Sequence, residues 1–252
     1  MLLASLLSLV SFLLVALLKS SFTTVDAKVN LWATSIQTSS FTAIAKIVAY
    51  IFDTTALLAI SLLIAVYLFY KNYRINSVLL LGAMGGDAAI GAITKTLVHS
   101  ARPLNGLMHD AGSSFPSGHT AGSIVLCGLL TYFGWQYWKS PKAKALSGAL
   151  FVATTFVVGF DRVYLNVHWF SDVLGGYLLG IFWLTFFILT FQLWLLRSVP
   201  VDKIFVEQPS PEAKVRVMLP MYKPLKATSC KKCGKTLGEP KELVRIVKTK
   251  KT

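Results

Sequence analysis

The sequence predicts an all-α protein, a polytopic bundle of six transmembrane helices. Apolar residues make up 54% of the 252-residue chain and charged residues only 14%. Soluble domains are roughly 45–50% apolar and about 25% charged. Apolar runs that approach the ~20 residues needed to cross the hydrocarbon core recur along the chain. This composition excludes a disordered protein, a secreted disulfide scaffold and an ordinary cytosolic enzyme.

Polar or basic segments separate the predicted spans. The spans are residues 2–18, 54–70, 77–98, 119–138, 145–160 and 169–196. Gly85-Gly86-Asp87 interrupts the third span, and the sixth is long enough to tilt or protrude. Residues 29–52 are too polar for a span, and apolar residues such as Trp32 and Phe41 predict one half-amphipathic helix lying at the membrane interface.

The first span has features of a signal peptide, since Val25-Asp26-Ala27 resembles a cleavable site. It lacks a basic segment before the apolar run, and Lys19 follows that run instead. We therefore expect the first helix to be retained, and Lys19 lies outside the membrane in either case.

Basic residues orient the bundle, because cytoplasmic loops carry an excess of Lys and Arg. Lys71 and Arg74, then the lysines of 139–144, then the tail fall on one side. Residues 99–118 and 161–168 fall on the other, extracytoplasmic side. We expect a multi-pass protein of the cell membrane, with a membrane domain at 1–196 and a basic cytoplasmic tail at 197–252.

The tail contributes +9 of the net charge of +14. It holds 14 basic and 5 acidic residues, so the charge does not predict a nucleic-acid partner. Cys230 and Cys233 form half of a zinc knuckle, but the tail holds no other Cys and no His. A structural zinc needs four ligands, so a reduced, solvated pair is expected. Cys127 lies in an apolar run, and neither a metal nor a cofactor is predicted.

Ionisable residues close to the bilayer form the candidate site, because such groups are expensive there and usually functional. They are Lys95, Arg102, His119, Arg162, His168 and Asp172. A single Lys or Arg at a helix end usually only extends to the interface. The topology, however, brings all six to the extracytoplasmic side, so we expect one active site on that face.

The cations suit a dianionic phosphate. Arg102 and Arg162 can grip phosphate oxygens with two hydrogen bonds each, whereas Lys95 acts as a point charge. Ser117 can cap the helix that follows it, and Gly118 allows backbone N–H groups to approach an anion.

The two histidines suit phosphoryl transfer. His168 and Asp172 are four residues apart and share a helix face. A carboxylate that holds one imidazole nitrogen leaves the other free to attack. His119 is then the candidate general acid for the leaving alkoxide.

Three segments carry a family resemblance: Lys95-x6-Arg102-Pro103, Pro116-Ser117-Gly118-His119 and Arg162-x5-His168-x3-Asp172. They resemble the signature motifs of the type 2 phosphatidic acid phosphatase superfamily, and the resemblance covers about residues 26–196. It implies a metal-independent phosphatase with a phosphohistidine intermediate. By that resemblance His168 is the nucleophile, Asp172 orients it and His119 is the acid. The same resemblance assigns phosphate binding to Lys95, Arg102, Ser117, Gly118 and Arg162.

One residue departs from the family pattern, because Asp161 stands where Ser is usual. A carboxylate facing the pocket would repel phosphate, so we expect Asp161 to point away or to pair with Arg162. Asp87, eight residues before Lys95, is expected to have either a supporting or a structural role. His99 and His109 are interpreted as solvated or interfacial.

The predicted function is hydrolysis of a lipid phosphomonoester or pyrophosphate. Undecaprenyl pyrophosphate, phosphatidylglycerol phosphate, phosphatidate and lipid A phosphates remain open as substrates, and the oligomeric state is not predicted. A lipid-to-lipid phosphotransferase would share every site residue. An intramembrane serine hydrolase using Ser117 would not need the three cations, and a non-enzymatic lipid-phosphate carrier would not need the two histidines beside Asp172.

Overall fold

The computed structural model describes residues 1–198, with side chains described through residue 194. This part of the chain is helical and contains no strand. Its elements are α1 Leu2–Leu17, the 3-10 helix η1 Lys19–Phe22, α2 Thr23–Ser35, α3 Ser39–Ile51, α4 Thr54–Tyr70, α5 Arg74–Val98, α6 Gly118–Tyr137, α7 Pro141–Tyr164 and α8 Phe170–Ser198. The predicted tail, with Cys230 and Cys233, lies outside the described residues.

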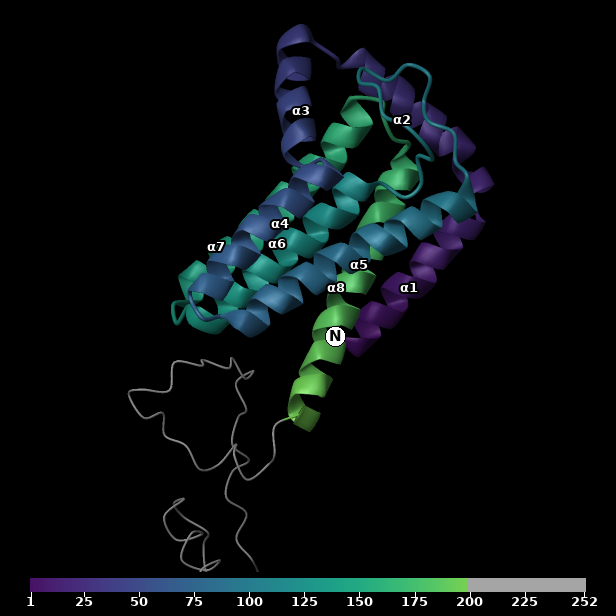
Figure 1. Ribbon diagram of the computed structural model, residues 1–252. Coiled ribbons are helices and arrows are strands. Elements are labelled where there is room, and N and C mark those ends of the chain that lie inside the picture. Colours follow the sequence, from purple (N-terminus) through teal and green to yellow (C-terminus); the bar gives the residue numbers. More distant parts are fainter. Residues whose placement is uncertain (199–252) are drawn as a thin grey trace, which may run out of the picture. The chain divides into compact units, whose positions relative to one another are not determined.

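The long helices pack side by side, and α6 contacts α4, α5, α7 and α8 (Figure 1). α1 packs along α8 on the far side of that group. Glycines bring α8 close to α6: a Cβ on Gly176 would lie 2.7 Å from the Ser117 carbonyl oxygen, and one on Gly180 would lie 2.9 Å from that of Ala121. Small residues at such positions let transmembrane helices approach closely.

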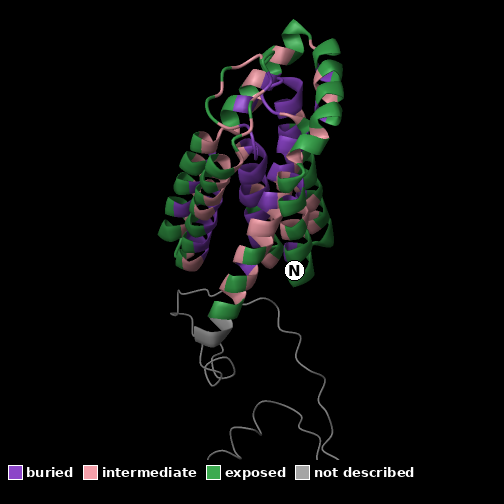
Figure 2. Cartoon of the chain, turned by 90° about the vertical axis from the view of Figure 1, so that its right-hand side faces the viewer, coloured by how far each residue is buried: buried purple, intermediate pink, exposed green. Residues whose placement is uncertain are grey.

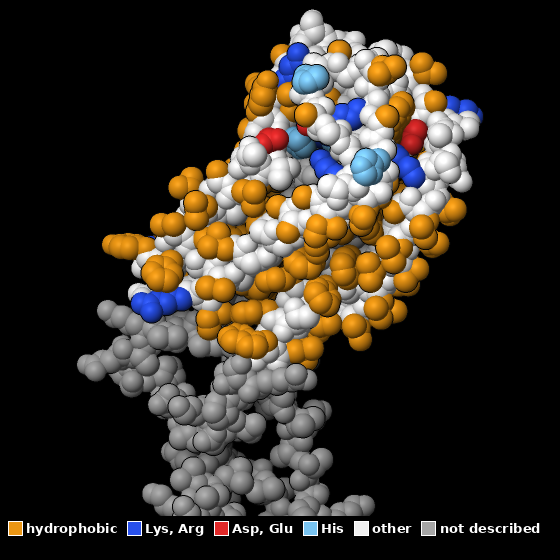
Figure 3. Space-filling model, turned by 45° about the vertical axis from the view of Figure 1, so that its right-hand side comes forward, with side chains coloured by type: hydrophobic (Ala, Val, Ile, Leu, Met, Phe, Trp, Pro, Cys, Tyr) orange, Lys and Arg blue, Asp and Glu red, His pale blue; other side chains and the backbone are white. Residues whose placement is uncertain are grey.

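The outer surface of the bundle is apolar. Residues such as Leu63 and Phe156 are 70% and 66% exposed, while Leu80 and Leu129 are fully buried between the helices. Figure 2 shows the buried residues along the inside of the bundle, and Figure 3 shows hydrophobic side chains covering its flank. Apolar surface on this scale is typical of a protein surrounded by lipid.

Length and composition identify three helices that can cross a membrane: α5, α7 and α8. Two bent pairs raise the number to five, namely α1 with residues 19–35 at 77° and α3 with α4 at 52°. The structure places a helix at each of the six predicted ranges, but α6 does not pass this test, since it is rich in Gly, Ser and Thr. The count of six spans therefore stays a prediction.

Two details of the sequence prediction are wrong. Residues 29–52 form the end of α2 and all of α3, with a corner at 36–38 where the Thr38 hydroxyl accepts a hydrogen bond from the Phe41 N–H. α5 continues without interruption through Gly85-Gly86-Asp87. Gly86 packs directly against the Trp183 ring of α8, so this glycine serves helix packing rather than a break.

The corner between α2 and α3 caps the end of the bundle near the α7–α8 loop. The Gln37 amide donates to the Tyr164 carbonyl oxygen at 2.7 Å, and the Asn166 amide donates to the Thr34 hydroxyl at 2.8 Å. The Leu107 N–H, from the α5–α6 loop, donates to the Leu165 carbonyl oxygen at 2.9 Å. These bonds hold two loops and one helical corner together at the end where the motif residues lie.

Candidate active site

The three motifs meet at one end of the bundle, where Figure 3 shows charged and His side chains gathered. Lys95 lies near the end of α5, and Arg102 lies in the loop that follows. Ser117, Gly118 and His119 begin α6, Arg162 ends α7, His168 lies in the α7–α8 loop and Asp172 lies in the first turn of α8. The structure thus brings residues 95–172 together across four helices.

His168 and Asp172 form a buried pair. His168 is 2% exposed and Asp172 is fully buried. His168 Nδ1 lies 3.6 Å from Asp172 Oδ2. Asp172 Oδ2 also accepts a hydrogen bond from the Trp169 N–H at 2.8 Å. Burial lowers the pKa of His168 below its usual value, although Asp172 opposes this shift. The imidazole is therefore held in the neutral form that a nucleophile needs.

Arg102 influences which nitrogen of His168 carries the proton. Its Nη1 lies 3.3 Å from His168 Nε2 and donates to the Val167 carbonyl oxygen at 2.8 Å. Because a guanidinium only donates hydrogen bonds, this contact favours the tautomer with the proton on Nδ1, which lies 3.6 Å from Asp172 Oδ2 and has no hydrogen-bond partner within the described residues. The free lone pair of His168 consequently points toward a phosphate-binding cation.

Arg162 is 2% exposed and pairs with Asp161, which is 4% exposed. The carboxylate accepts from Arg162 Nε at 3.0 Å and also from Nη2. Pairing was one of the two arrangements expected for Asp161. The pair turns part of the guanidinium away from an incoming phosphate.

The start of α6 differs from its predicted role in one respect. The Ser117 side chain does not cap the helix, and its hydroxyl accepts a hydrogen bond from the Thr120 hydroxyl at 3.1 Å. The Ser117 N–H donates to the Asp172 carbonyl oxygen at 3.1 Å, which ties α6 to α8. A Cβ on Gly118 would lie 2.9 Å from the Thr54 hydroxyl, so glycine here lets α4 approach.

His119 faces His168 across the site. The ring centroids are 6.5 Å apart and the rings are inclined at 65°. His119 Nε2 lies 3.7 Å from Asp53 Oδ2, a carboxylate that caps α4. The separation of the two imidazole rings leaves room for one phosphoryl group between them.

A cavity of about 630 Å³ opens onto these groups. His119, Arg162 and Asp110 line its polar side, and Ala49, Tyr50, Ala56, Ala59 and Met108 line an apolar side formed by α3, α4 and the α5–α6 loop. Lys95 is half-buried and does not line this cavity. It interacts electrostatically with Arg102 and Asp110. The arrangement combines an anion site with an apolar channel beside it.

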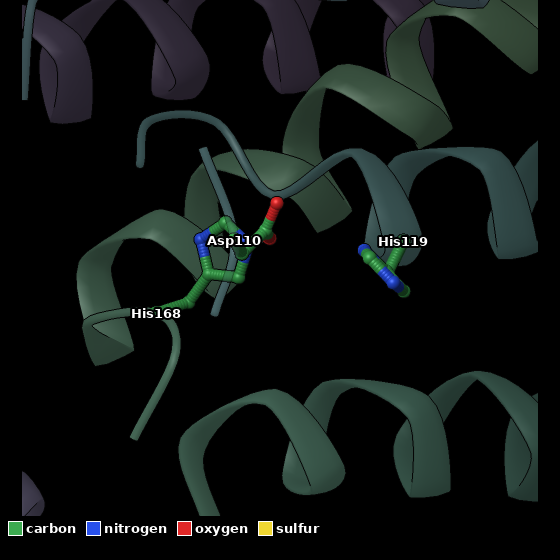
Figure 4. A group of neighbouring side chains, drawn as sticks. All are labelled: Asp110, His119 and His168. Atoms are coloured by element: carbon green, nitrogen blue, oxygen red, sulfur yellow. The ribbon is translucent and has the colours of Figure 1, made fainter. Parts of the chain in front are cut away.

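Asp110 already contacts the anion site. Its Oδ2 lies 3.0 Å from Arg102 Nη1 and 3.9 Å from His168 Nε2. Figure 4 shows this side chain beside the His168 ring, with His119 across from both. The carboxylate thus stands where an oxygen of a bound phosphate would meet Arg102.

Asp110, His119 and His168 offer ligand atoms that lie within 4.8 Å of one another, a spacing that would fit a metal ion. Arg102 is paired with Asp110, and Arg162 lines the same cavity. Two fixed cations oppose the entry of a dication and favour an anion. Metal independence stays a prediction.

Several acids and one lysine of the site were not predicted from the sequence. Asp53 precedes Thr54-Thr55 at the start of a predicted span, which is an N-cap pattern that could have placed it at a helix start. His109, interpreted as solvated, lines the cavity. Lys19 and Asp26 lie close to Asp172, and nothing in their spacing indicated this.

Comparisons with known proteins agree with the fold and with the family resemblance. The model of the PAP2 superfamily matches residues 76–195. The chain is 30% identical to phosphatidylglycerophosphatase B of Bacillus subtilis over 127 residues. This segment is 50% of this chain and 63% of that protein. The chain is also 30% identical over 129 residues to the undecaprenyl-diphosphatase of Sulfolobus acidocaldarius, covering 48% and 58% of the two chains.

A putative undecaprenyl-diphosphatase, YbjG of Escherichia coli, is 38% identical over 76 residues, or 30% of this chain and 34% of that protein. The crystal structure of a transmembrane PAP2 type phosphatidylglycerolphosphate phosphatase from Bacillus subtilis shares the fold, with a TM-score of 0.69 at 22% identity over 78% of this chain and 98% of that one. The fold is an all-helical bundle with helices able to cross a membrane. Over residues 76–195, just under half of the chain, the sequence is similar to the PAP2 superfamily.

The matched segment is shorter than expected. The predicted resemblance began near residue 26, whereas the family model begins at residue 76. The matches span from 34% to 63% of the length of these curated relatives.

Proposed function

We propose that this protein is a metal-independent lipid phosphate hydrolase of the cell membrane, with its active site on the extracytoplasmic face. The buried His168–Asp172 pair, facing His119 across a cavity that Arg162 lines, is the observation that carries the proposal. A carrier would need the cations but not this pair. A serine hydrolase would need an accessible Ser117, which is fully buried.

The reaction proceeds in two steps. His168 Nε2 attacks the phosphorus atom, the bond from phosphorus to the lipid oxygen breaks, and His119 gives a proton to the leaving oxygen. His119, now neutral, takes a proton from water, the water oxygen attacks phosphorus, and the bond to Nε2 breaks. Asp172 holds the Nδ1 proton throughout, which stabilises the imidazolium that forms.

Fixed cations neutralise the phosphate during both steps. Arg102 lies 3.3 Å from the attacking nitrogen and Arg162 lines the cavity. Lys95 adds charge from the end of α5, and the start of α6 offers backbone N–H groups at Gly118 and beyond. Charge that develops on the phosphoryl oxygens is therefore stabilised without a metal.

A lipid is the substrate class that fits the cavity. Its apolar side is built from alanines of α3 and α4, helices whose other faces are exposed and apolar. A lipid in the outer leaflet can place its phosphate on the cations while its tail stays in hydrocarbon. The relatives named above act on phosphatidylglycerophosphate or undecaprenyl diphosphate by their names, and both lipids belong in the test, with phosphatidate and lipid A phosphates.

The test is release of inorganic phosphate by the purified protein in mixed micelles across that panel. His168→Ala should abolish release, whereas His99→Asn, an exposed residue with a left-handed φ of 44° that Asn tolerates, should not. Rapid quenching should trap an acid-labile, base-stable phosphoenzyme. Transfer of labelled phosphate to an acceptor lipid without free phosphate would show a phosphotransferase, and an acid-stable label would make a serine the nucleophile.

The orientation needs a separate experiment. Leu104 is fully exposed in the α5–α6 loop, so a Leu104→Cys variant lacking Cys127, Cys230 and Cys233 should react with an impermeant thiol reagent on intact cells. Labelling only after the cells are opened would place the site in the cytoplasm.

A further inference from the structure

Lys19 is placed directly behind the nucleophile's carboxylate. It begins η1, immediately after α1, and its Nζ lies 2.6 Å from Asp172 Oδ1. The ammonium also donates to the Ser171 hydroxyl and lies 5.6 Å from the centroid of the Phe115 ring. A residue outside the segment matched by the family model thus touches the acid of that segment.

Asp26, on α2, holds the other side of this contact. Its Oδ2 lies 3.6 Å from Lys19 Nζ and accepts from the Ser171 hydroxyl at 2.6 Å, while its Oδ1 accepts from the Ser171 N–H at 2.9 Å. Asp26 is 5% exposed and Asp172 is fully buried. Lys19 therefore sits between two buried carboxylates, one in the site and one behind it.

The two oxygens of Asp172 have different partners. Oδ2 faces His168 and the Trp169 N–H, and Oδ1 faces Lys19. A buried carboxylate without a cation is unfavourable, and its ionised form depends on such a partner. Lys19 keeps Asp172 charged and fixes its rotation, and this in turn orients the proton on His168 Nδ1.

Packing of the first helix makes this contact possible. Phe12 and Val15 of α1 are buried with Phe115 and Leu179, so α1 lies along α8 and ends beside its first turn. Lys19 lines a cavity of about 520 Å³ with Asp26, His99 and Trp169, and that cavity shares no lining residue with the one that receives phosphate. Lys19 therefore contacts Asp172 through Oδ1, the oxygen that does not face His168.

We propose that Lys19 and Asp26 are positioning residues of the phosphatase, with Lys19 holding the Asp172 carboxylate that orients the nucleophile His168. The proposal rests on the function proposed above. It also makes residues 19–26 part of the working enzyme, and cleavage near Val25-Asp26-Ala27 would remove them.

A double-mutant cycle between Lys19 and Asp172 tests this. Lys19→Gln keeps a hydrogen-bond donor and loses the charge. It should lower kcat by about 10- to 100-fold, by analogy with metal sites, where removing the outer partners of ligating histidines has an effect of this size. KM should change less than about threefold, because Lys19 contacts the Asp172 oxygen that does not face His168 and lines a separate cavity. In the Asp172→Asn background the same change should lower kcat less than about threefold, since the carboxylate it serves is gone.

Three further arms complete the design. Lys19→Arg keeps the charge and should retain more activity than Lys19→Gln. Lys28→Gln is the matched control, because Lys28 is an exposed lysine of α2, and it should behave as wild type. If Lys19→Gln alone does not fold, the double variant has no unpaired buried carboxylate at 172, and its rate is compared with Asp172→Asn.

The outcomes separate the two proposals. Full activity of Lys19→Gln, an equal loss in both backgrounds, or an effect confined to KM would overturn the role of Lys19. If wild type releases no phosphate, or His168→Ala remains active, the proposed function fails instead.

Discussion

Gly176→Ala is the sharpest test of how the site is assembled, because it adds one methyl group between the two helices that carry it. His119 is the second residue of α6, which begins at Gly118. Asp172 lies in the first turn of α8. A Cβ at position 176 would lie 2.7 Å from the Ser117 carbonyl oxygen and 2.9 Å from Thr120 Cβ. Ordinary contacts of a Cβ begin at 3.4 Å.

The size of the effect follows from these distances. Neither neighbour is the free end of a flexible side chain, so the helices must separate by roughly 0.5–0.7 Å to restore contact distance. Overpacking of this kind destabilises by about 1–3 kcal/mol, and replacing Gly by Ala in a helix returns up to about 1 kcal/mol. The net loss of stability is modest, about 0–2 kcal/mol.

The effect on activity should be larger than the effect on stability. A misplacement of about 1 Å between reacting groups lowers rates by about 100-fold, so a shift of half that size should lower kcat by about 10-fold. The assay is phosphate release in mixed micelles, with Tm of the same samples. The control is Gly85→Ala, an exposed position of α5 where a Cβ meets nothing within 4 Å, and it should keep full activity and an equal or higher Tm. Wild-type kcat in Gly176→Ala would refute the close packing of α6 and α8 as the feature that aligns the site.

Three other predictions follow from the anion site. Asp161→Ser removes the carboxylate that pairs with the buried Arg162, so Tm without ligand should fall. Vanadate should raise Tm more in this variant than in wild type. Equal increases in Tm would contradict the idea that Asp161 competes with phosphate for Arg162. Asp110→Asn removes a carboxylate 3.0 Å from Arg102 Nη1, so KM should fall several-fold with kcat within about twofold; a large loss of kcat would make Asp110 part of the chemistry. EDTA should leave phosphate release unchanged, because Arg102 and Arg162 already neutralise the phosphate; loss that magnesium restores would refute this.

Local chemistry accounts for what the sequence predicted well. Apolar runs show where helices form, and the structure places a helix at each of the six predicted ranges. His168 and Asp172 were expected to share a helix face; the structure does bring them together, but His168 lies in the loop before α8 and only Asp172 is helical. For Asp161 the sequence left two arrangements open, pointing away or pairing with Arg162, and the structure shows the pair.

Some local contacts were missed, and contacts between helices could not be predicted in this way. The N-cap at Thr38 is local and marks the corner at 36–38, whereas the packing of Gly86 against the Trp183 ring joins two helices far apart in sequence. The Ser117 side chain was expected to cap α6, but Thr120 takes its hydroxyl.

The sequence by itself determined the class of protein, the helices and the residues of the three motifs, since composition, periodicity and short spacing act along the chain. Only the tertiary structure decided that Lys19, 153 residues from Asp172, supports its carboxylate. It also decided that Asp53 faces His119 and that Asp110 meets Arg102. The physical reason is that a charge acts over a few ångströms of space, and the packing of α1 on α8 and of α4 beside α6 decides which charges come within that distance.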